Sequence, residues 1–206
     1  MYPFFESMAL IDGSIQRIAF HQNRINRTFA KYYPSIKPIE LRSILIPDEF
    51  NFDQLQKLKL NYNSNNYEIN ISHYNPIQFD QFYFINDDQI NYDFKYTDRN
   101  QLDYWRQQIE PQSQFIIIKN NLLTDSHFSN LVFTNGKHWI TPKTPLHAGT
   151  MRAHLIDKHK IIQSYVSVST LHLFTHFKLI NALNTLESAY LYPTELLIEP
   201  YVSYLK

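Results

Sequence analysis

The stretch DSHFSNLVFTNGKHWITPKTPLHAGTMR, from Asp125 to Arg152, contains the densest set of structural signals in the chain. It holds an acidic residue, a Ser-Asn pair, an Asn-Gly turn and a Gly-Thr-Met-Arg helix start. The chain has only three glycines, and two of them, Gly136 and Gly149, lie here. An Asn-Gly pair between two apolar runs is typical of a hairpin turn. Gly149 stands where a helix start usually carries Ser or Asp, so we expect its small size to admit a ligand.

The segment Gly149-Thr150-Met151-Arg152 has the features of an anion site. The backbone amides in the first turn of a helix lack intrahelical acceptors and lie at the positive end of the helix dipole. A phosphate binds such amides readily, and glycine permits its close approach. The alternative is a plain helix start with no ligand, and the tetrapeptide alone does not exclude it.

Composition favours a globular protein and excludes several classes of function. The 206 residues are enough for one large domain or two small ones, and 15 Tyr and 15 Phe supply apolar surface for a core. Nineteen basic and nineteen acidic residues balance, so global charge recruits neither nucleic acid nor a membrane surface. The chain has no cysteine, no apolar run of membrane-spanning length and no basic, apolar leader at its N-terminus. We therefore expect a cytoplasmic protein.

Hydrophobic patterning predicts strands mixed with helices, which indicates an α+β fold rather than a regular parallel α/β fold. Helical spacing occupies residues 21–33 and 100–109, with Asp98 or Asn100 as the cap of the second helix, and a short helix is expected at 38–46. The expected strands and hairpins cover residues 4–18, 57–74, 81–86, 90–96, 115–120, 129–141 and 161–169. Asp87-Asp88 marks the expected junction of two lobes, 1–87 and 88–206.

Two basic side chains are candidates for chemistry. Arg24 follows His21 by three residues on the first expected helix, and its guanidinium can make fork-shaped contacts to a phosphate. The plainer interpretation of Arg24 is a solvated helix face. Lys95 lies among aromatic residues, where poor solvation favours the neutral amine that attacks carbonyls. The plainer interpretation of Lys95 is a lysine that extends to solvent beside Asp93.

Asp125 completes the set of candidates. An acidic residue in a turn before a strand commonly forms a cap or an Asx-turn. In the functional interpretation, its carboxylate keeps a heteroaromatic nitrogen protonated. Together these candidates match what pyridoxal phosphate requires. The set offers an amine for a covalent link to a carbonyl, an acid for a ring nitrogen, and a helix start plus an arginine for a phosphate.

The order of these motifs resembles the class IV aminotransferase family of pyridoxal-phosphate enzymes, over about residues 4–185. The similar segments are FFESMALIDGSI, HQNRINR, KYTDRNQL, TDSHFSNLVF, TPKTPLHAGTMR and FKLINALN. The resemblance implies that Lys95 binds the cofactor covalently and that Asp125 binds the pyridine nitrogen. It also implies phosphate contacts from Arg24 and from the Gly149 helix start, through the amides of Thr150 and Met151. Asn181 or its neighbour Ala182 would border the phosphate.

The resemblance implies a two-lobed fold similar to D-amino acid aminotransferase, with a small α+β N-terminal lobe and a pseudo-barrel C-terminal lobe that carries Lys95 and the phosphate loop. It also implies a homodimer. The chain departs from the family in its short N-terminus, in Asp125 where Glu is usual, and in the turn of NYNSNNYEI, which lacks the Arg- and Gly-rich sequence of some chorismate lyases. Lys59, on the strand before this turn, is a candidate contact for a substrate carboxylate.

Overall similarity favours a 4-amino-4-deoxychorismate lyase-like protein, which would release pyruvate and p-aminobenzoate for folate biosynthesis. An amino-acid aminotransferase of the branched-chain or D-amino acid type is the alternative within the family. A third possibility is a non-catalytic protein that retains the fold, but the joint presence of Lys95, Arg24 and Gly149 argues against it. No histidine spacing makes a convincing metal site, and no nucleic acid or membrane partner is expected.

Overall fold

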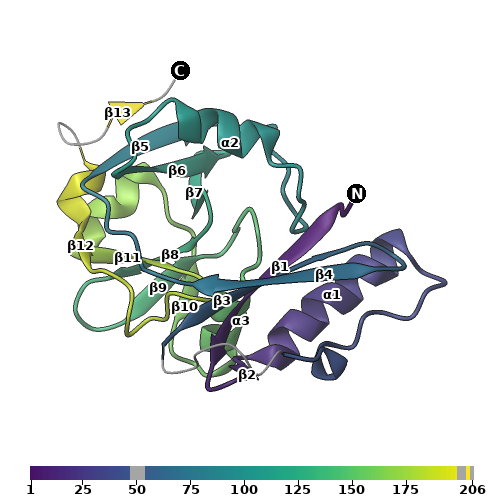
Figure 1. Ribbon diagram of the computed structural model, residues 1–206. Helices are drawn as coiled ribbons and strands as arrows, with labels where there is room; N and C mark the ends of the chain where they lie inside the picture. Colours follow the sequence, from purple (N-terminus) through teal and green to yellow (C-terminus); the bar gives the residue numbers. More distant parts are fainter. Residues whose placement is uncertain (47–53, 199–202, 205–206) are drawn as a thin grey trace. The chain divides into compact units, whose positions relative to one another are not determined.

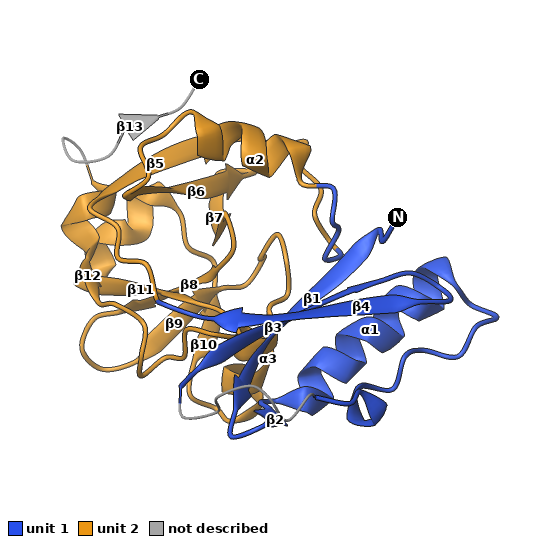
Figure 2. Ribbon diagram, viewed as in Figure 1, with its two compact units in different colours: residues 1–75, 94–98 blue, residues 76–93, 99–206 orange. Residues whose placement is uncertain are grey.

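The computed structural model describes residues 1–46, 54–198 and 203–204 of the 206-residue chain. The chain divides into two compact units, residues 1–75 with 94–98 and residues 76–93 with 99–206 (Figure 2). Unit 1 therefore extends only to residue 75 before the chain enters unit 2, not to residue 87 as the sequence suggested. The reason is that the strand at residues 81–86 pairs with the strand at 113–119, which belongs to unit 2.

Unit 1 is a four-stranded antiparallel sheet with one long helix (Figure 1). The strands lie in the order β2-β1-β3-β4. The elements are β1 (Phe4–Ile11), β2 (Ser14–Ile15), α1 (Ile18–Tyr32), the 3-10 helix η1 (Leu41–Ser43), β3 (Gln56–Tyr62) and β4 (Tyr67–His73). The hairpins at Asp12-Gly13 and at residues 57–74 and the helix at 21–33 are confirmed, whereas the helix expected at 38–46 is only the single turn of η1.

Alternation in β3 explains why this strand separates two environments. Leu58, Leu60 and Tyr62 are buried against α1, where Ile25 and Phe29 lie one helical turn apart. The intervening residues of β3, which include Lys59, point to the opposite face of the sheet and are partly exposed. The face away from α1 can therefore carry polar and charged side chains.

Unit 2 is built on a nine-stranded mixed sheet among the described residues (Figure 1). Its elements are β5 (Gln81–Asn86), α2 (Asn100–Gln107), β6 (Ser113–Lys119), β7 (Leu122–Ser126), β8 (Asn130–Thr134), β9 (Trp139–Pro142), α3 (Thr150–Asp157), β10 (Ile162–Ser164), η2 (Val168–Leu173), β11 (His176–Ile180), β12 (Tyr192–Pro193), η3 (Thr194–Leu197) and β13 (Ser203–Tyr204). The main path of pairing runs β10-β9-β8-β7-β6-β5-β13, and β11 pairs with β8 and β12.

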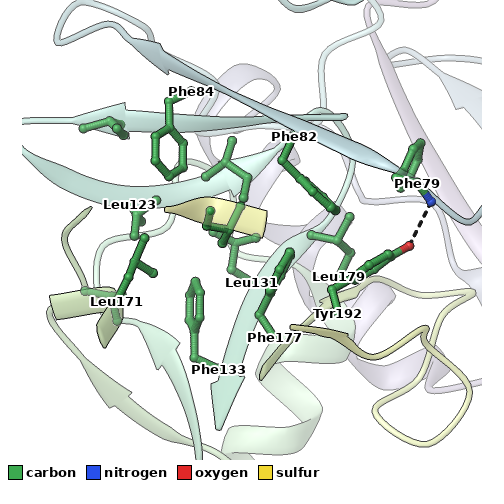
Figure 3. Close-up of a cluster of buried hydrophobic side chains, with 14 residues drawn as sticks. Phe79, Phe82, Phe84, Leu123, Leu131, Phe133, Leu171, Phe177, Leu179 and Tyr192 are labelled. Carbon is green, nitrogen blue, oxygen red and sulfur yellow. Dashed lines mark hydrogen bonds between the residues drawn. The ribbon is translucent and has the colours of Figure 1, made fainter. Parts of the chain in front are cut away.

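The sheet of unit 2 curls around its own core. Phe82 of β5 meets Phe177 of β11 with ring centroids 5.0 Å apart, and Phe177 lies 6.0 Å from Phe133 of β8 (Figure 3). The hydroxyl of Tyr192 accepts a hydrogen bond from the backbone N–H of Phe79 at 3.1 Å and ties β12 to this cluster. The mixture of sheet and helices agrees with the expected α+β class. Leu123 of β7 and Leu131 of β8 belong to this core, so it supports the two strands that carry the polar residues described below.

Three local predictions need correction. Residues 90–96 form no regular strand, because the segment meets β1 at only one isolated bridge, between Phe4 and Tyr96. The N–H of Phe5 donates to the carbonyl of Lys95 at 3.0 Å, which holds the lysine in unit 1 instead of in the C-terminal lobe. The N-cap of α2 is Arg99, with no side-chain cap, so neither Asp98 nor Asn100 has that role.

Candidate functional site

In unit 1, Arg24 is held by a buried carboxylate. Ile18–Tyr32 forms one helix, and the spacing of three residues places His21 and Arg24 on the side of α1 that faces β1. The guanidinium of Arg24 donates from Nε to Glu6 Oε1 at 2.7 Å and from Nη2 to Glu6 Oε2. His21 Nδ1 lies 2.7 Å from the same Oε2. Arg24 is only 7% exposed, so the interpretation of a solvated helix face is wrong.

The charges of this cluster compensate one another. Burial by itself would raise the pKa of Glu6, but the charge of Arg24 and the hydrogen bonds from His21 and Arg24 outweigh it and hold that pKa far below its usual range. Burial lowers the pKa of His21, against the opposing effect of its hydrogen bond to Glu6. Glu6 is therefore ionised at neutral pH and fixes the direction of the Arg24 fork.

Two lysines of unit 1 share one aromatic neighbour. The Nζ of Lys95 lies 4.5 Å from the ring centroid of Phe5, and the Nζ of Lys59 lies 5.3 Å from the same ring. Lys59 pairs with Ser7 in the register of β1 and β3, on the face away from α1. Both ammonium groups therefore lie near the same ring at the polar face of the sheet, and each gains a cation–π attraction there.

In unit 2, Asp125 is joined to the loop before α3. Asp125 is the last residue but one of β7 and pairs with Asn130, the first residue of β8. Its Oδ1 accepts from Asn130 Nδ2 at 2.7 Å, and its Oδ2 accepts from the backbone N–H of His147 at 2.6 Å. Asp125 is 4% exposed. These two direct donors to the carboxylate are neutral groups, because one is an amide side chain and the other is a peptide N–H.

Burial makes the charge of Asp125 costly. It raises the pKa of this carboxyl to about 7, although the hydrogen bonds from His147 and Asn130 and the charge of Arg152 oppose the shift. A cation placed against Asp125 would favour the ionised form. The carboxyl is therefore suited to a cationic partner such as a protonated ring nitrogen.

Gly149 is the N-cap of α3, as expected, but its small size has another cause. A Cβ at this position would lie 2.1 Å from Asn130 Oδ1. Its backbone, at φ −66° and ψ 149°, is open to any residue. Its N–H donates to Asn130 Oδ1 at 3.2 Å. Asn130, rather than a ligand, thus requires the glycine, which corrects the expectation from the sequence.

The residues after Gly149 are buried. Thr150 and Met151 are 4% and 2% exposed, and they form the first turn of α3. The guanidinium of Arg152 is bonded elsewhere in unit 2, because Nη2 donates to the carbonyl of Pro142 at 2.8 Å and to Gln163 Oε1 at 2.9 Å. Any anion at this helix start would therefore rely on backbone amides and not on Arg152.

Asn181 follows β11 and closes a turn. Its Oδ1 accepts from the N–H of Leu183 at 2.8 Å and of Asn184 at 2.9 Å, and its Nδ2 donates to Ser129 Oγ at 3.0 Å. Ser129 directly precedes Asn130, so Asn181 is joined to the segment that carries Asp125.

Sequence reasoning assigned no role to Glu6, His21 or Asn130, which the geometry brings forward. Glu6 and His21 hold Arg24, and Asn130 links Asp125 to Gly149. The usable signals were the glutamate inside an otherwise apolar strand and the helical spacing of His21 and Arg24. Asn130 belongs to the Ser-Asn pair noted in the sequence, but its link to Gly149 could not be read there, because its contacts with His147 and Gly149 lie 17 and 19 residues further along the chain.

Comparison with known proteins defines the class of protein. The family model described as amino-transferase class IV matches residues 3–186. The chain therefore belongs to the class IV aminotransferase family, whose members are pyridoxal-phosphate-dependent enzymes. This confirms the resemblance drawn from the sequence motifs.

Particular relatives lie within that class. An uncharacterized protein of Haemophilus influenzae is 34% identical over 90% of this chain and 100% of its own length. The crystal structure of a candidate 4-amino-4-deoxychorismate lyase from Haemophilus somnus 129PT is 30% identical, with a TM-score of 0.83 over 90% of this chain and 98% of that one. A candidate amino-acid aminotransferase from Mesorhizobium loti shares the fold, with 17% identity and a TM-score of 0.73 over 100% of both chains.

Each unit, taken by itself, carries groups with the chemistry to bind one part of pyridoxal phosphate. The cofactor presents an aldehyde, a basic ring nitrogen and a phosphate. Unit 1 supplies the amine of Lys95 and the guanidinium of Arg24, and unit 2 supplies the buried acid Asp125 and the first turn of α3. Among the described residues, no helix is long and apolar enough to cross a membrane.

Proposed function

We propose that this chain is a pyridoxal-phosphate-dependent lyase of the 4-amino-4-deoxychorismate type, which releases pyruvate and leaves p-aminobenzoate. The observation that carries the cofactor assignment is Asp125, a buried carboxyl with neutral direct donors that shares a network with the start of α3. The likeness to the Haemophilus somnus protein supports the choice of the lyase.

Each residue has a separate role in this proposal. Bound pyridoxal phosphate supplies an aldehyde that condenses with amines and a ring that withdraws electrons from the substrate's α-carbon. Lys95 provides the amine that binds the cofactor and then moves a proton at the α-carbon. Asp125 keeps the ring nitrogen protonated. Arg24, Thr150, Met151 and Asn181 hold or border the phosphate, and Gly149 is the N-cap of α3, the helix that carries Thr150 and Met151.

Lys59 is proposed to bind a carboxylate of the substrate. Its ammonium lies against the same ring as that of Lys95, on a partly exposed face of the sheet. In the described part of the chain, Lys59 forms no ion pair with a carboxylate, so a charged ligand meets no competing ion pair. Lys59→Met should raise KM for 4-amino-4-deoxychorismate with little change in kcat. Lys57→Met, two residues away on the same face, is the matched control for a general loss of charge.

The deciding experiment offers purified protein with added pyridoxal phosphate two kinds of substrate. With 4-amino-4-deoxychorismate, the proposal predicts pyruvate and p-aminobenzoate in equal amounts. Conversion of the bound cofactor to its amine form by amino acids, without p-aminobenzoate, would instead establish an aminotransferase. Cofactor binding without turnover of either 4-amino-4-deoxychorismate or amino acids would establish a non-catalytic protein.

We also propose a homodimer, as the family resemblance implies. Light scattering on eluting protein should give twice the 24.7 kDa chain mass. A monomer that retains full activity would refute this part of the proposal.

A further inference from the structure

One side chain, Asn130, touches both parts of the proposed cofactor site in unit 2. It is 5% exposed and lies at the first position of β8. Its Nδ2 donates to Asp125 Oδ1 at 2.7 Å and to the carbonyl of His147 at 2.8 Å, and its Oδ1 accepts from the N–H of Gly149 at 3.2 Å. The carbonyl of His147 and the N–H of Gly149 together fix which end of the amide faces which way.

The close contact with Gly149 makes the two positions interdependent. An added Cβ at Gly149 would meet Oδ1 of Asn130 at 2.1 Å and its Cγ at 3.2 Å. The Asn130 amide cannot retreat without breaking its bonds to Asp125 and His147. A methyl group at position 149 must therefore displace either the start of α3 or the amide that orients Asp125.

We propose that Asn130 is a positioning residue that couples the acid for the ring nitrogen to the helix start for the phosphate. The inference rests on the proposed function, since it assumes that Asp125 and α3 hold opposite ends of one cofactor. Asn130 sets the direction of the Asp125 carboxylate and holds the loop of residues 147–149 at a fixed distance from it. The two contacts then match the length of a rigid ligand before the ligand arrives.

The first test needs no cofactor. Gly149→Ala should lower the melting temperature of the apoprotein, and the same substitution should cause a smaller loss in an Asn130→Ala background, because the clashing oxygen is gone there. Gly136→Ala is the matched control: Gly136 has φ +88° and open space around its Cβ, so its strain is in the backbone and Asn130→Ala should not relieve it. Equal losses from Gly149→Ala with and without Asn130 would overturn the coupling.

The second test measures the affinity for pyridoxal phosphate and the pH dependence of its absorbance. Asn130→Asp replaces the amide donor by a carboxylate that faces Asp125, so affinity for pyridoxal phosphate should fall by about tenfold or more. The pH at which the absorbance of the bound cofactor changes should also move, which a purely structural role would not cause. Asn130→Ser at the same position should lose affinity with a smaller shift in that pH. Wild-type affinity and pH dependence in Asn130→Asp would overturn the positioning role.

The two tests separate the failure of this inference from the failure of the proposed function. If the wild-type protein binds no pyridoxal phosphate, the proposed function fails, and the cofactor role of Asn130 fails with it. The melting temperatures still decide whether Asn130 dictates the glycine. If the wild-type protein binds the cofactor but the Asn130 variants bind it equally well, only the inference fails.

Discussion

Glu6 in unit 1 and Asp125 in unit 2 are both buried carboxylates, but their partners differ in charge. Glu6 accepts from a guanidinium and lies against a histidine ring, and its pKa is held far below the usual range. Asp125 accepts from an amide and a peptide N–H, and burial raises its pKa to about 7. The comparison indicates that unit 1 completes its own charge pair, whereas unit 2 has an acid suited to a cation from a ligand.

The largest effect should come from breaking the pair in unit 1. Glu6→Gln leaves the Arg24 guanidinium buried without its counter-ion, which should reduce the free energy of unfolding by about 3–5 kcal/mol. Urea denaturation of the apoprotein measures this loss. Glu68→Gln, at an exposed position of β4 in the same sheet, is the control, and its free energy of unfolding should stay within about 0.5 kcal/mol of wild type. A small loss for Glu6→Gln would show that the pair contributes little.

The second prediction concerns how the free energy of unfolding depends on pH, which should differ in sign between Asp125 and Glu6. Because the pKa of Asp125 is raised on folding, its contribution is fully present below its unfolded pKa and is lost as pH rises through about 7. Relative to Asp125→Asn, the free energy of unfolding of the wild-type apoprotein should fall by about 4 kcal/mol between about pH 4 and pH 8. Glu6 has the opposite sign, because a lowered pKa gives stability that is lost as pH falls below its unfolded value.

Denaturation of the apoprotein at several pH values checks both signs. In Asp125→Asn, the free energy of unfolding should fall less than in wild type as pH rises towards 8. In Glu6→Gln, it should fall less than in wild type as pH is lowered. Parallel pH profiles for wild type and Asp125→Asn would contradict the account of Asp125 as an uncompensated buried acid.

The smallest effect concerns the support around Asp125. Ser129→Ala removes the acceptor of the Asn181 side chain, which should cost about 0.5–1.5 kcal/mol of unfolding free energy. Thermal denaturation measures this change. Ser169→Ala, at an exposed position of η2, is a control that removes a hydroxyl outside the network. A loss from Ser129→Ala no greater than that of the control would show that Asn181 adds nothing to the segment.

The sequence predicted the units' main elements because their signals are local. The spacing of His21, Ile25 and Phe29 defines α1, and the alternation of residues 57–62 defines β3. Motif order also predicted the family. The pairing of Arg24 with Glu6 and of Asp125 with the His147 N–H was not predicted, because Glu6 lies 18 residues from Arg24 and His147 lies 22 residues from Asp125. Such pairs arise from tertiary packing, which no local pattern encodes.

The same limit explains the error at Gly149. Its position at a helix start was readable, but the cause of its small size, the Asn130 side chain, comes from a strand 19 residues earlier. Lys95 was assigned to the wrong unit for a similar reason. Its segment reads as a strand, yet its backbone bonds to Phe5 at the start of β1.

The most direct test of the central claim is borohydride reduction of the protein incubated with pyridoxal phosphate, followed by mapping of the modified lysine. The account predicts one dominant modification, on Lys95, and its loss in Lys95→Ala with an unchanged circular dichroism spectrum. Modification spread over exposed lysines, or an equal yield in Lys95→Ala, would contradict the assignment of this chain as a pyridoxal-phosphate enzyme with Lys95 at its centre.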